Sequence, residues 1–166
     1  LRRDESPRKA DIYLQNPFIA NNLRWAHQYL SKSREISPLQ PFVQAKMGQI
    51  EAIVGNPENA AKNMENATAI APMNSNLRLL VGLYYLQADN AVGAAPHLKQ
   101  YLKFNRRGFK KVMDIVAGKS GRRIAPMNDK LVFEQIIPDD AEMLFTLATR
   151  YFSKSSEYYR PALDKA

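Results

Sequence analysis

Few residues of this 166-residue chain have the types and spacing that support catalysis. The stretch GKSG, which begins at Gly118, matches the last residues of a phosphate-binding loop. That loop also requires a glycine at the position that Met113 occupies. A nucleotide site is therefore not expected, and a basic turn is the simpler interpretation.

The histidines and carboxylates are no more suggestive of an active site. Neither His27 nor His97 is followed three or four residues later by a carboxylate or a second histidine, whereas a metal site needs several converging ligands. Asp139 and Asp140 stand where a helix is expected to begin, and the helix dipole explains negative charge there. The chain has no cysteine, which excludes disulfides and thiolate chemistry. We expect a protein that is not an enzyme and needs no metal or cofactor.

Positive charge is concentrated in one segment, residues 99–123. The chain has a net charge of +8, and this segment accounts for the whole excess. Its basic residues are Lys99, Lys103, Arg106, Arg107, Lys110, Lys111, Lys119, Arg122 and Arg123. The segment is either a solvated face or a patch for an anionic partner. Phe104 and Phe109 flank its centre, where aromatic rings can stack on bases, although phenylalanine at helical spacing also fits a core.

The elements that position these residues are all expected to be helices, because alternating strand patterns are absent. Residues 1–17 are polar and mixed in charge, and we expect them to form a linker or arm. A capping box of Asp139 and Glu142 predicts a helix that begins there. The other helices are expected near 18–35, 40–54, 57–70, 75–88, 90–104, 107–118, 128–136 and 156–166.

Two of these helices carry further information. Asn56 followed by Pro57 is a start signal for the third helix, which has small apolar residues on one face. That face consists of Ala60, Met64 and Ala67. The helix at 75–88 is apolar around most of its circumference, so we expect it to be central and sandwiched. Its apolar residues are Leu77, Leu79, Leu80, Val81, Leu83, Tyr84, Tyr85 and Leu86.

Small and apolar residues recur at an interval of 34 positions. The pairs are Gly48 with Gly82, Ala60 with Ala94, Ala61 with Ala95, Met64 with Leu98, and, upstream, Ala26 with Ala60, Leu30 with Met64 and Pro38 with Pro72. Antiparallel helices joined by a short loop pack closely where they cross, which favours Gly or Ala. Glycine inside a helix costs about 1 kcal/mol relative to alanine, so its presence indicates close packing. The interval predicts a repeated helix–turn–helix unit.

This pattern resembles the tetratricopeptide repeat family, whose repeat is about 34 residues long. The resemblance rests on Met47-Gly48, Ala60, Met64, Ala67 and Pro72 in one unit, and on Val81-Gly82, Tyr85, Ala94 and Leu98 in the next. It implies an all-α, right-handed solenoid of stacked antiparallel helix pairs. It further implies a single domain over 18–166, with a half-unit at 18–38, units at 41–74 and 75–108, and degenerate helices at 109–166.

The chain departs from the family pattern at several positions. Tyr101 stands where the second helix usually has a small residue, and Arg106 stands where proline is usual. Glu51 replaces the usual aromatic residue of the first helix. Pro96 lies inside a second helix and lacks a backbone donor, so we expect that helix to start late or to kink.

The resemblance implies a non-enzymatic scaffold that binds a peptide or protein segment in a concave groove lined by the first helix of each unit. The candidate groove residues are Phe42, Lys46, Gln49, Ile53, Asn76, Leu83 and Gln87. Lys110 and Met113 would extend the line. The alternative is that Phe42, Ile53 and Leu83 belong to the core. The family's clamp for a terminal carboxylate is not expected, because Ala45 and Gln49 occupy the matching positions.

The alternative function is binding of nucleic acid or anionic lipid through residues 99–123, and nucleic acid is the less favoured partner. By analogy with long bacterial chains that carry such arrays, we expect a role in an envelope, secretion or export assembly. The periplasm or envelope is accordingly favoured over the cytoplasm. The chain begins with Leu1, so we expect an excised or processed fragment, from which an upstream membrane anchor would be missing. The oligomeric state is left open.

Overall fold

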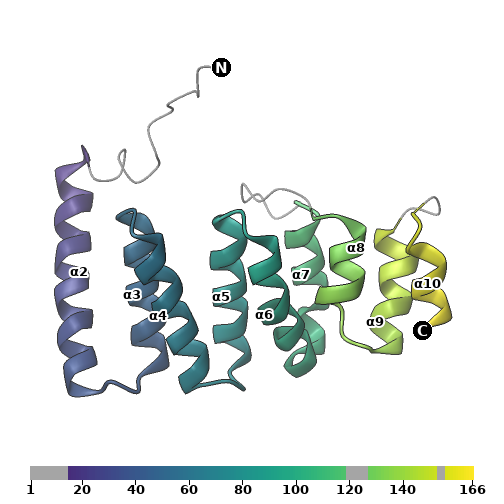
Figure 1. Ribbon diagram of the computed structural model, residues 1–166, viewed down its shortest axis with the longest axis horizontal. Helices are drawn as coiled ribbons and strands as arrows, with labels where there is room; N and C mark the ends of the chain where they lie inside the picture. The colour runs from purple at the N-terminus through teal and green to yellow at the C-terminus, as the bar shows by residue number, and fades with distance from the viewer. Residues whose placement is uncertain (1–14, 119–126, 153–155) are drawn as a thin grey trace. The chain divides into compact units, whose positions relative to one another are not determined.

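The computed structural model describes residues 15–118, 127–152 and 156–166, and within these ranges the chain is helical with no strand (Figure 1). The predicted all-α class is therefore confirmed. No helix in these ranges is both long enough and apolar enough to cross a bilayer. The chain divides into two compact units, an N-terminal unit (Leu1–Pro72) and a C-terminal unit (Met73–Ala166).

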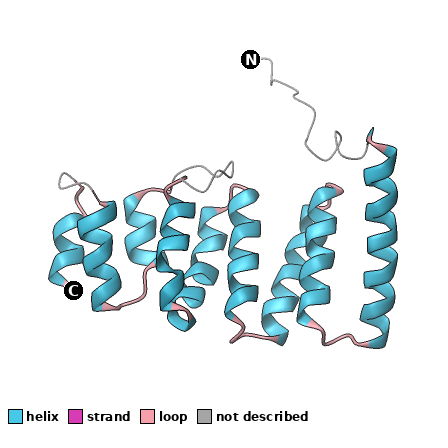
Figure 2. Cartoon of the chain, turned by 180° about the vertical axis from the view of Figure 1, so that it is seen from behind, coloured by secondary structure: helices cyan, strands magenta, loops and turns pink. Residues whose placement is uncertain are grey.

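The N-terminal unit contains the helices α2 (Pro17–Ile36), α3 (Pro41–Ile53) and α4 (Pro57–Ile70). Consecutive helices run in opposite directions, and α3 packs against both of its neighbours (Figures 1 and 2). The predicted start of α4 is confirmed, because the Asn56 side chain accepts a hydrogen bond of 3.4 Å from the Asn59 amide. Asn16 caps α2 in the same manner.

The interior of the N-terminal unit is built from α3 and α4. The predicted small-residue face of α4 is fully buried, as are apolar residues of α3. The buried apolar residues are Ala45, Met47, Ile50, Ala60, Met64 and Ala67. By contrast, α2 contributes no fully buried residue and packs with half-buried side chains.

The C-terminal unit begins with the hairpin of α5 (Ser75–Gln87) and α6 (Ala91–Phe104). A 3-10 turn, η1 (Arg106–Gly108), leads into α7 (Phe109–Val116). The chain continues through α8 (Asp129–Leu131) with the π-helical η2 (Val132–Ile136), then α9 (Ala141–Thr146) with the π-helical η3 (Leu147–Tyr151), and ends in α10 (Tyr159–Asp164). One contiguous hydrophobic core extends from Leu79 on α5 to Ala162 on α10.

Several boundaries differ from those predicted. The basic helix expected at 107–118 is divided into η1 and α7, and the last helix is shorter than the expected 156–166. The cap before α9 is Asp140 rather than Asp139, because the Asp140 carboxylate accepts from the Met143 amide at 3.2 Å. Asp140 has the extended backbone that a cap requires. The late start expected from Pro96 does not occur, since α6 begins at Ala91.

The two best-defined hairpins share one register of 34 residues. Adding 34 to both ends of α3 gives the ends of α5, and the same shift converts the ends of α4 into those of α6. The two positive-φ residues in the turns, Gly55 (82°) and Asp89 (56°), are also 34 apart. α7 begins a further 34 residues after α5, but ends early at Val116. The predicted 34-residue interval is therefore also the spacing between equivalent helix ends and turn residues of the two hairpins.

Candidate functional site

Four candidate groove residues form a line along one face of α3, which we call the α3 stripe: Phe42, Lys46, Gln49 and Ile53. Each follows the previous one by three or four residues, so all four lie on one side of the helix. Phe42 is 44% exposed and Ile53 is 36% exposed. Between them, Lys46 Nζ donates to Gln49 Oε1 at 3.0 Å. The stripe therefore has two apolar ends and a hydrogen-bonded polar centre.

A close helix crossing holds α3 in place on the α4 side. A Cβ atom added to Gly48 would lie 2.9 Å from the Ala60 carbonyl oxygen and 3.1 Å from Met64 Cγ. Contacts that short are essentially never tolerated, so the backbones can approach this closely only because Gly48 has no side chain. The prediction that these small residues meet at the crossing is confirmed.

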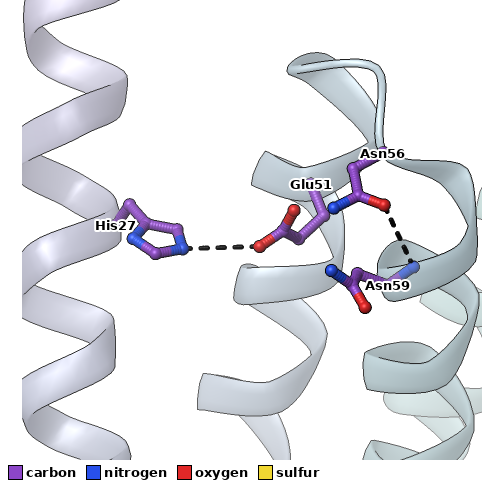
Figure 3. A network of polar contacts seen from close by, with 4 residues as sticks. All are labelled: His27, Glu51, Asn56 and Asn59. Carbon is purple, nitrogen blue, oxygen red and sulfur yellow. Dashed lines mark hydrogen bonds and ion pairs between the residues drawn. The ribbon is translucent and has the colours of Figure 1, made fainter.

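Polar contacts hold α3 on the α2 side. His27 Nε2 on α2 lies 3.4 Å from Glu51 Oε1 on α3 (Figure 3), a contact that becomes an ion pair when the imidazole is protonated. The buried Gln44 donates from Nε2 to the Pro38 carbonyl in the α2–α3 turn at 3.3 Å. Glu51, which departs from the family pattern, thus contacts α2.

The corresponding positions on α5 are Asn76, Leu83 and Gln87, each 34 residues after a member of the α3 stripe. Asn76 and Gln87 are exposed, whereas Leu83 is half-buried against the core of the C-terminal unit. The equivalent of Lys46 is Leu80, which is half-buried. The α5 face is therefore polar at both ends and apolar at its centre, the reverse of the α3 stripe.

Exposure decides which of these residues can belong to a core. Phe42 and Ile53 are exposed, so the alternative that placed them in the core is wrong. For Leu83, partial burial against the core agrees with that alternative. Met113 is 3% exposed and lies in the core, so the expected extension of the line to this residue is also wrong. None of the eight apolar side chains of α5 is exposed.

The basic segment presents a partial patch. Among its described residues, Lys99 is half-buried, and the others are exposed: Lys103, Arg106, Arg107, Lys110 and Lys111. Lys119, Arg122 and Arg123 lie outside the described residues. Phe109 is buried and meets Tyr151 edge-on at 6.0 Å, so it is not placed to stack on a base. Phe104, by contrast, is exposed.

Acidic residues interrupt this patch at its centre. Arg106 Nη2 lies 2.8 Å from Asp140 Oδ2, the carboxylate that caps α9. A shallow pocket of about 260 Å³ beside this pair is lined by both charges, including Arg107 and Glu142. A mixed lining of this kind lacks the single sign of potential that concentrates an anionic ligand.

The residues considered for catalysis have structural partners instead. His97 is buried, stacks on Tyr85 with ring centroids 5.6 Å apart, and has Arg78 Nη1 at 3.2 Å from its Nδ1. Gly118 follows α7 with a φ of 71°, as in an ordinary helix end. Within the described ranges no group of three His, Asp or Glu residues could hold a metal ion.

Among the described residues, several tyrosines have clearly shifted pKa values. Burial raises the pKa of Tyr84 above its ordinary value of 10.0. Burial, followed by the negative charge of Asp114, raises the pKa of Tyr151. These shifts move the phenols away from neutral pH, so both stay protonated and are not poised for proton transfer.

Some features of the site were not predicted from the sequence. The contact between His27 and Glu51 joins residues that are 24 positions apart, and no local spacing indicates it. A second unpredicted feature is a set of exposed aromatic and aliphatic side chains on α2. In the sequence, Trp25 is the only member of this set that stands out. Both features depend on how the helices pack against one another, which the local sequence pattern does not determine.

No model of a known protein family matches this chain, and a search of curated proteins finds none that is similar to it. The function must therefore be argued from the geometry of the hairpins and their exposed faces.

Proposed function

We propose that this chain is a non-enzymatic scaffold of tetratricopeptide-like hairpins that stack into a right-handed solenoid, and that it binds an extended peptide or protein segment. The first helix of each hairpin supplies the binding face. The α3 stripe is the principal surface of the N-terminal unit, and in the C-terminal unit the corresponding face of α5 carries the exposed Asn76 and Gln87.

The observation that carries this proposal is the equivalence of the two hairpins. The same 34-residue shift relates the ends of α3 and α4 to those of α5 and α6. It also relates the crossing of Gly48 with Ala60 and Met64 to that of Gly82, whose added Cβ would lie 2.9 Å from Leu98 Cδ2 and 3.6 Å from the Ala94 carbonyl. Units that repeat in length and place a glycine at each helix crossing favour regular stacking, which creates an extended surface.

The chemistry of the α3 stripe indicates what it would bind. Phe42 and Ile53 are separated by about 16 Å along the helix axis, at about 1.5 Å per residue, which an extended segment of about five residues spans. Exposed apolar side chains at both ends can hold two apolar anchors of such a segment. Lys46 and Gln49 between them can donate hydrogen bonds, and the ammonium favours an acidic side chain. The preferred ligand is an extended peptide segment with an acidic side chain between two apolar ones.

The proposal is tested by selection from a library of random twelve-residue peptides on the immobilised protein. Peptides that are enriched are then titrated by fluorescence anisotropy against wild type, Phe42→Ser and Ile53→Ser. We expect enriched sequences with two apolar residues around an acidic one, and a loss of affinity of about tenfold for either variant.

Val54→Ser provides a matched control. Val54 is 39% exposed, close to the value for Ile53, but it is turned by about 100° from Ile53 around the helix. Its substitution should leave peptide affinity unchanged. Failure to enrich any peptide would contradict the proposal. Equal peptide affinity of wild type, Phe42→Ser, Ile53→Ser and Val54→Ser would contradict it as well.

Binding of nucleic acid or anionic lipid is the second candidate, and the five exposed basic residues at 103–111 favour it. Retention of a random-sequence duplex or RNA, or of vesicles that contain phosphatidylserine, at low salt would support it. Its affinity for nucleic acid should fall steeply with salt, with a log–log slope proportional to the phosphates contacted. Peptide binding to the α3 stripe should respond only mildly to salt.

A further inference from the structure

One face of α2 carries four exposed large side chains, which we call the α2 stripe: Phe18, Trp25, Tyr29 and Ile36. Their exposed fractions are 75%, 49%, 70% and 77%. Exposed single apolar residues are common, whereas several that gather on one face of a helix favour an interaction site. Four such residues on one helix therefore need an explanation.

Helix geometry places these residues on one line. Each residue turns the helix by about 100°, so Trp25, Tyr29 and Ile36 all lie within about 20° of Phe18 when viewed down the axis. The rings of Trp25 and Tyr29 are neighbours, with centroids 6.4 Å apart. The half-buried residues of α2 lie on a different side, which faces α3 and includes Leu23 and Leu30. Within the N-terminal unit the α2 stripe therefore points away from the helix that α2 packs against.

The α2 stripe is symmetric about its own midpoint. Phe18 and Ile36 lie nine residues on either side of position 27, and Trp25 and Tyr29 lie two residues on either side. If a second copy packs antiparallel across a two-fold axis at position 27, Phe18 meets Ile36 of the second copy and Trp25 meets Tyr29 of the second copy. Such self-complementarity is what an isologous interface requires.

The size and charge of the face also suit a second copy. With about 200 Å² for each large side chain, the exposed fractions give about 550 Å² per chain, or about 1,100 Å² for a pair. This total, which corresponds to complete burial of the four side chains, lies just below the range of stable interfaces, about 1,200–2,000 Å², and suits a weak or transient one. Lys32 is the charged residue nearest the line, and in this pairing it meets Asn22 of the second copy rather than another lysine.

We propose that the α2 stripe is a homodimerisation surface, in which two copies of α2 pack antiparallel about a two-fold axis at position 27. An area of this size is typical of weak or transient contacts, so we expect the dimer to form only at high protein concentration. The α3 stripe takes no part in this contact, so dimer formation and peptide binding are separable.

Sedimentation equilibrium from about 1 to 500 µM tests the association. We expect the mass to rise from the 18.9 kDa of one chain toward twice that value. Tyr29→Glu and Trp25→Glu should each weaken the dimer by about tenfold or more, because a charge would be buried against an aromatic ring. Phe145→Glu is the matched control, since Phe145 is an exposed aromatic residue of the C-terminal unit.

The register can be tested by cross-linking, because the chain has no cysteine of its own. A mixture of Phe18→Cys and Ile36→Cys chains should form a mixed disulfide under mild oxidation. Phe18→Cys alone should not, since its two copies would lie about 27 Å apart at 1.5 Å per residue, well beyond disulfide reach of about 7 Å.

Three results would overturn the proposal. A monomer mass at every concentration would rule out the homodimer. A dimer that Phe145→Glu weakens as much as Tyr29→Glu would place the interface elsewhere. Efficient cross-linking of Phe18→Cys alone would establish a parallel pairing. Circular dichroism of each variant should match wild type, because the substituted side chains are exposed.

Discussion

Gly48 and Gly82 are equivalent in register but not in what surrounds them. An added Cβ at Gly48 meets a backbone oxygen at 2.9 Å, which cannot move without displacing α4. An added Cβ at Gly82 meets the end of the Leu98 side chain at the same distance, while the nearest backbone oxygen is 3.6 Å away. A flexible side chain can rotate away, so the two glycines should tolerate substitution differently.

Gly48→Ala should therefore destabilise the protein by about 1–3 kcal/mol through overpacking. Gly82→Ala should be near neutral, because a gain of about 1 kcal/mol in helix propensity offsets the shift of Leu98. Urea denaturation of both variants measures the difference. Equal effects of the two substitutions would contradict the close crossing at Gly48.

Tyr151 should make stability sensitive to alkaline pH. Its pKa is raised in the folded state by burial and by the charge of Asp114, so the unfolded chain loses the phenolic proton first, near pH 10. The contribution is present below pH 10 and is lost as pH rises through the folded-state pKa. Tyr151→Phe keeps the ring against Phe109 and should show a smaller loss of stability above about pH 10. Parallel urea midpoints for both proteins from about pH 9 to 11 would contradict this assignment.

At the scale of elements, helix capping distinguishes the two hairpins. The Asn74 side chain caps α5 by accepting from the Leu77 amide at 3.1 Å. Gln40 occupies the equivalent place before α3 and makes no side-chain cap. Capping by a side chain satisfies one of the unpaired amides at a helix start.

Asn74→Ala should accordingly cost about 1 kcal/mol of stability. Gln40→Ala, at the matched position, should change the free energy of unfolding by less than about 0.5 kcal/mol. Thermal and urea denaturation can measure both. A larger loss for Gln40→Ala than for Asn74→Ala would show that the cap does not determine the start of α5.

The helices of the two hairpins could be predicted because their signals are local. Asn56 with Pro57, the small residues at the crossings and the 34-residue interval all act within a hairpin, and the observed ends of α4 coincide with the expected 57–70. Past residue 105 the signals weaken. There, helices are short and two are π-helical, so packing in the shared core, rather than local sequence, sets their ends.

The departure at Tyr101 shows why such details escape prediction. Tyr101 is 3% exposed, and its ring occupies the space that a side chain at residue 108 would need. An added Cβ at Gly108 would clash with this ring. A large residue at a place that usually takes a small one is thus matched by a glycine seven positions later. No spacing rule connects the two, because their contact depends on how η1 folds back.

The candidate binding residues were only partly predictable for a related reason. Periodicity identified the line of Phe42, Lys46, Gln49 and Ile53, but not that Leu83, on the equivalent face of α5, is half-buried. The exposed α2 stripe was missed because periodicity does not reveal which side of a helix is covered. The side facing α3 is also marked by apolar residues, such as Leu23 and Leu30.

At the scale of the whole molecule, three surfaces differ in their chemistry. The α3 stripe is apolar at its ends and polar at its centre. The α2 stripe consists of aromatic and aliphatic side chains with polar residues beside them, and the exposed residues at 103–111 include five basic side chains. Each predicts a different response: a mild effect of salt for peptide binding, concentration dependence for self-association, and a steep effect of salt for nucleic acid.

The most direct test of the central claim is a map of where a selected peptide binds. The amide resonances of ¹⁵N-labelled protein are followed while the tightest peptide from the library is added at a concentration low enough to keep the chain monomeric. The account predicts shift changes concentrated in α3, at residues 41–53, with smaller changes at the exposed ends of α5. Changes confined to residues 99–118, with α3 unaffected, would contradict it.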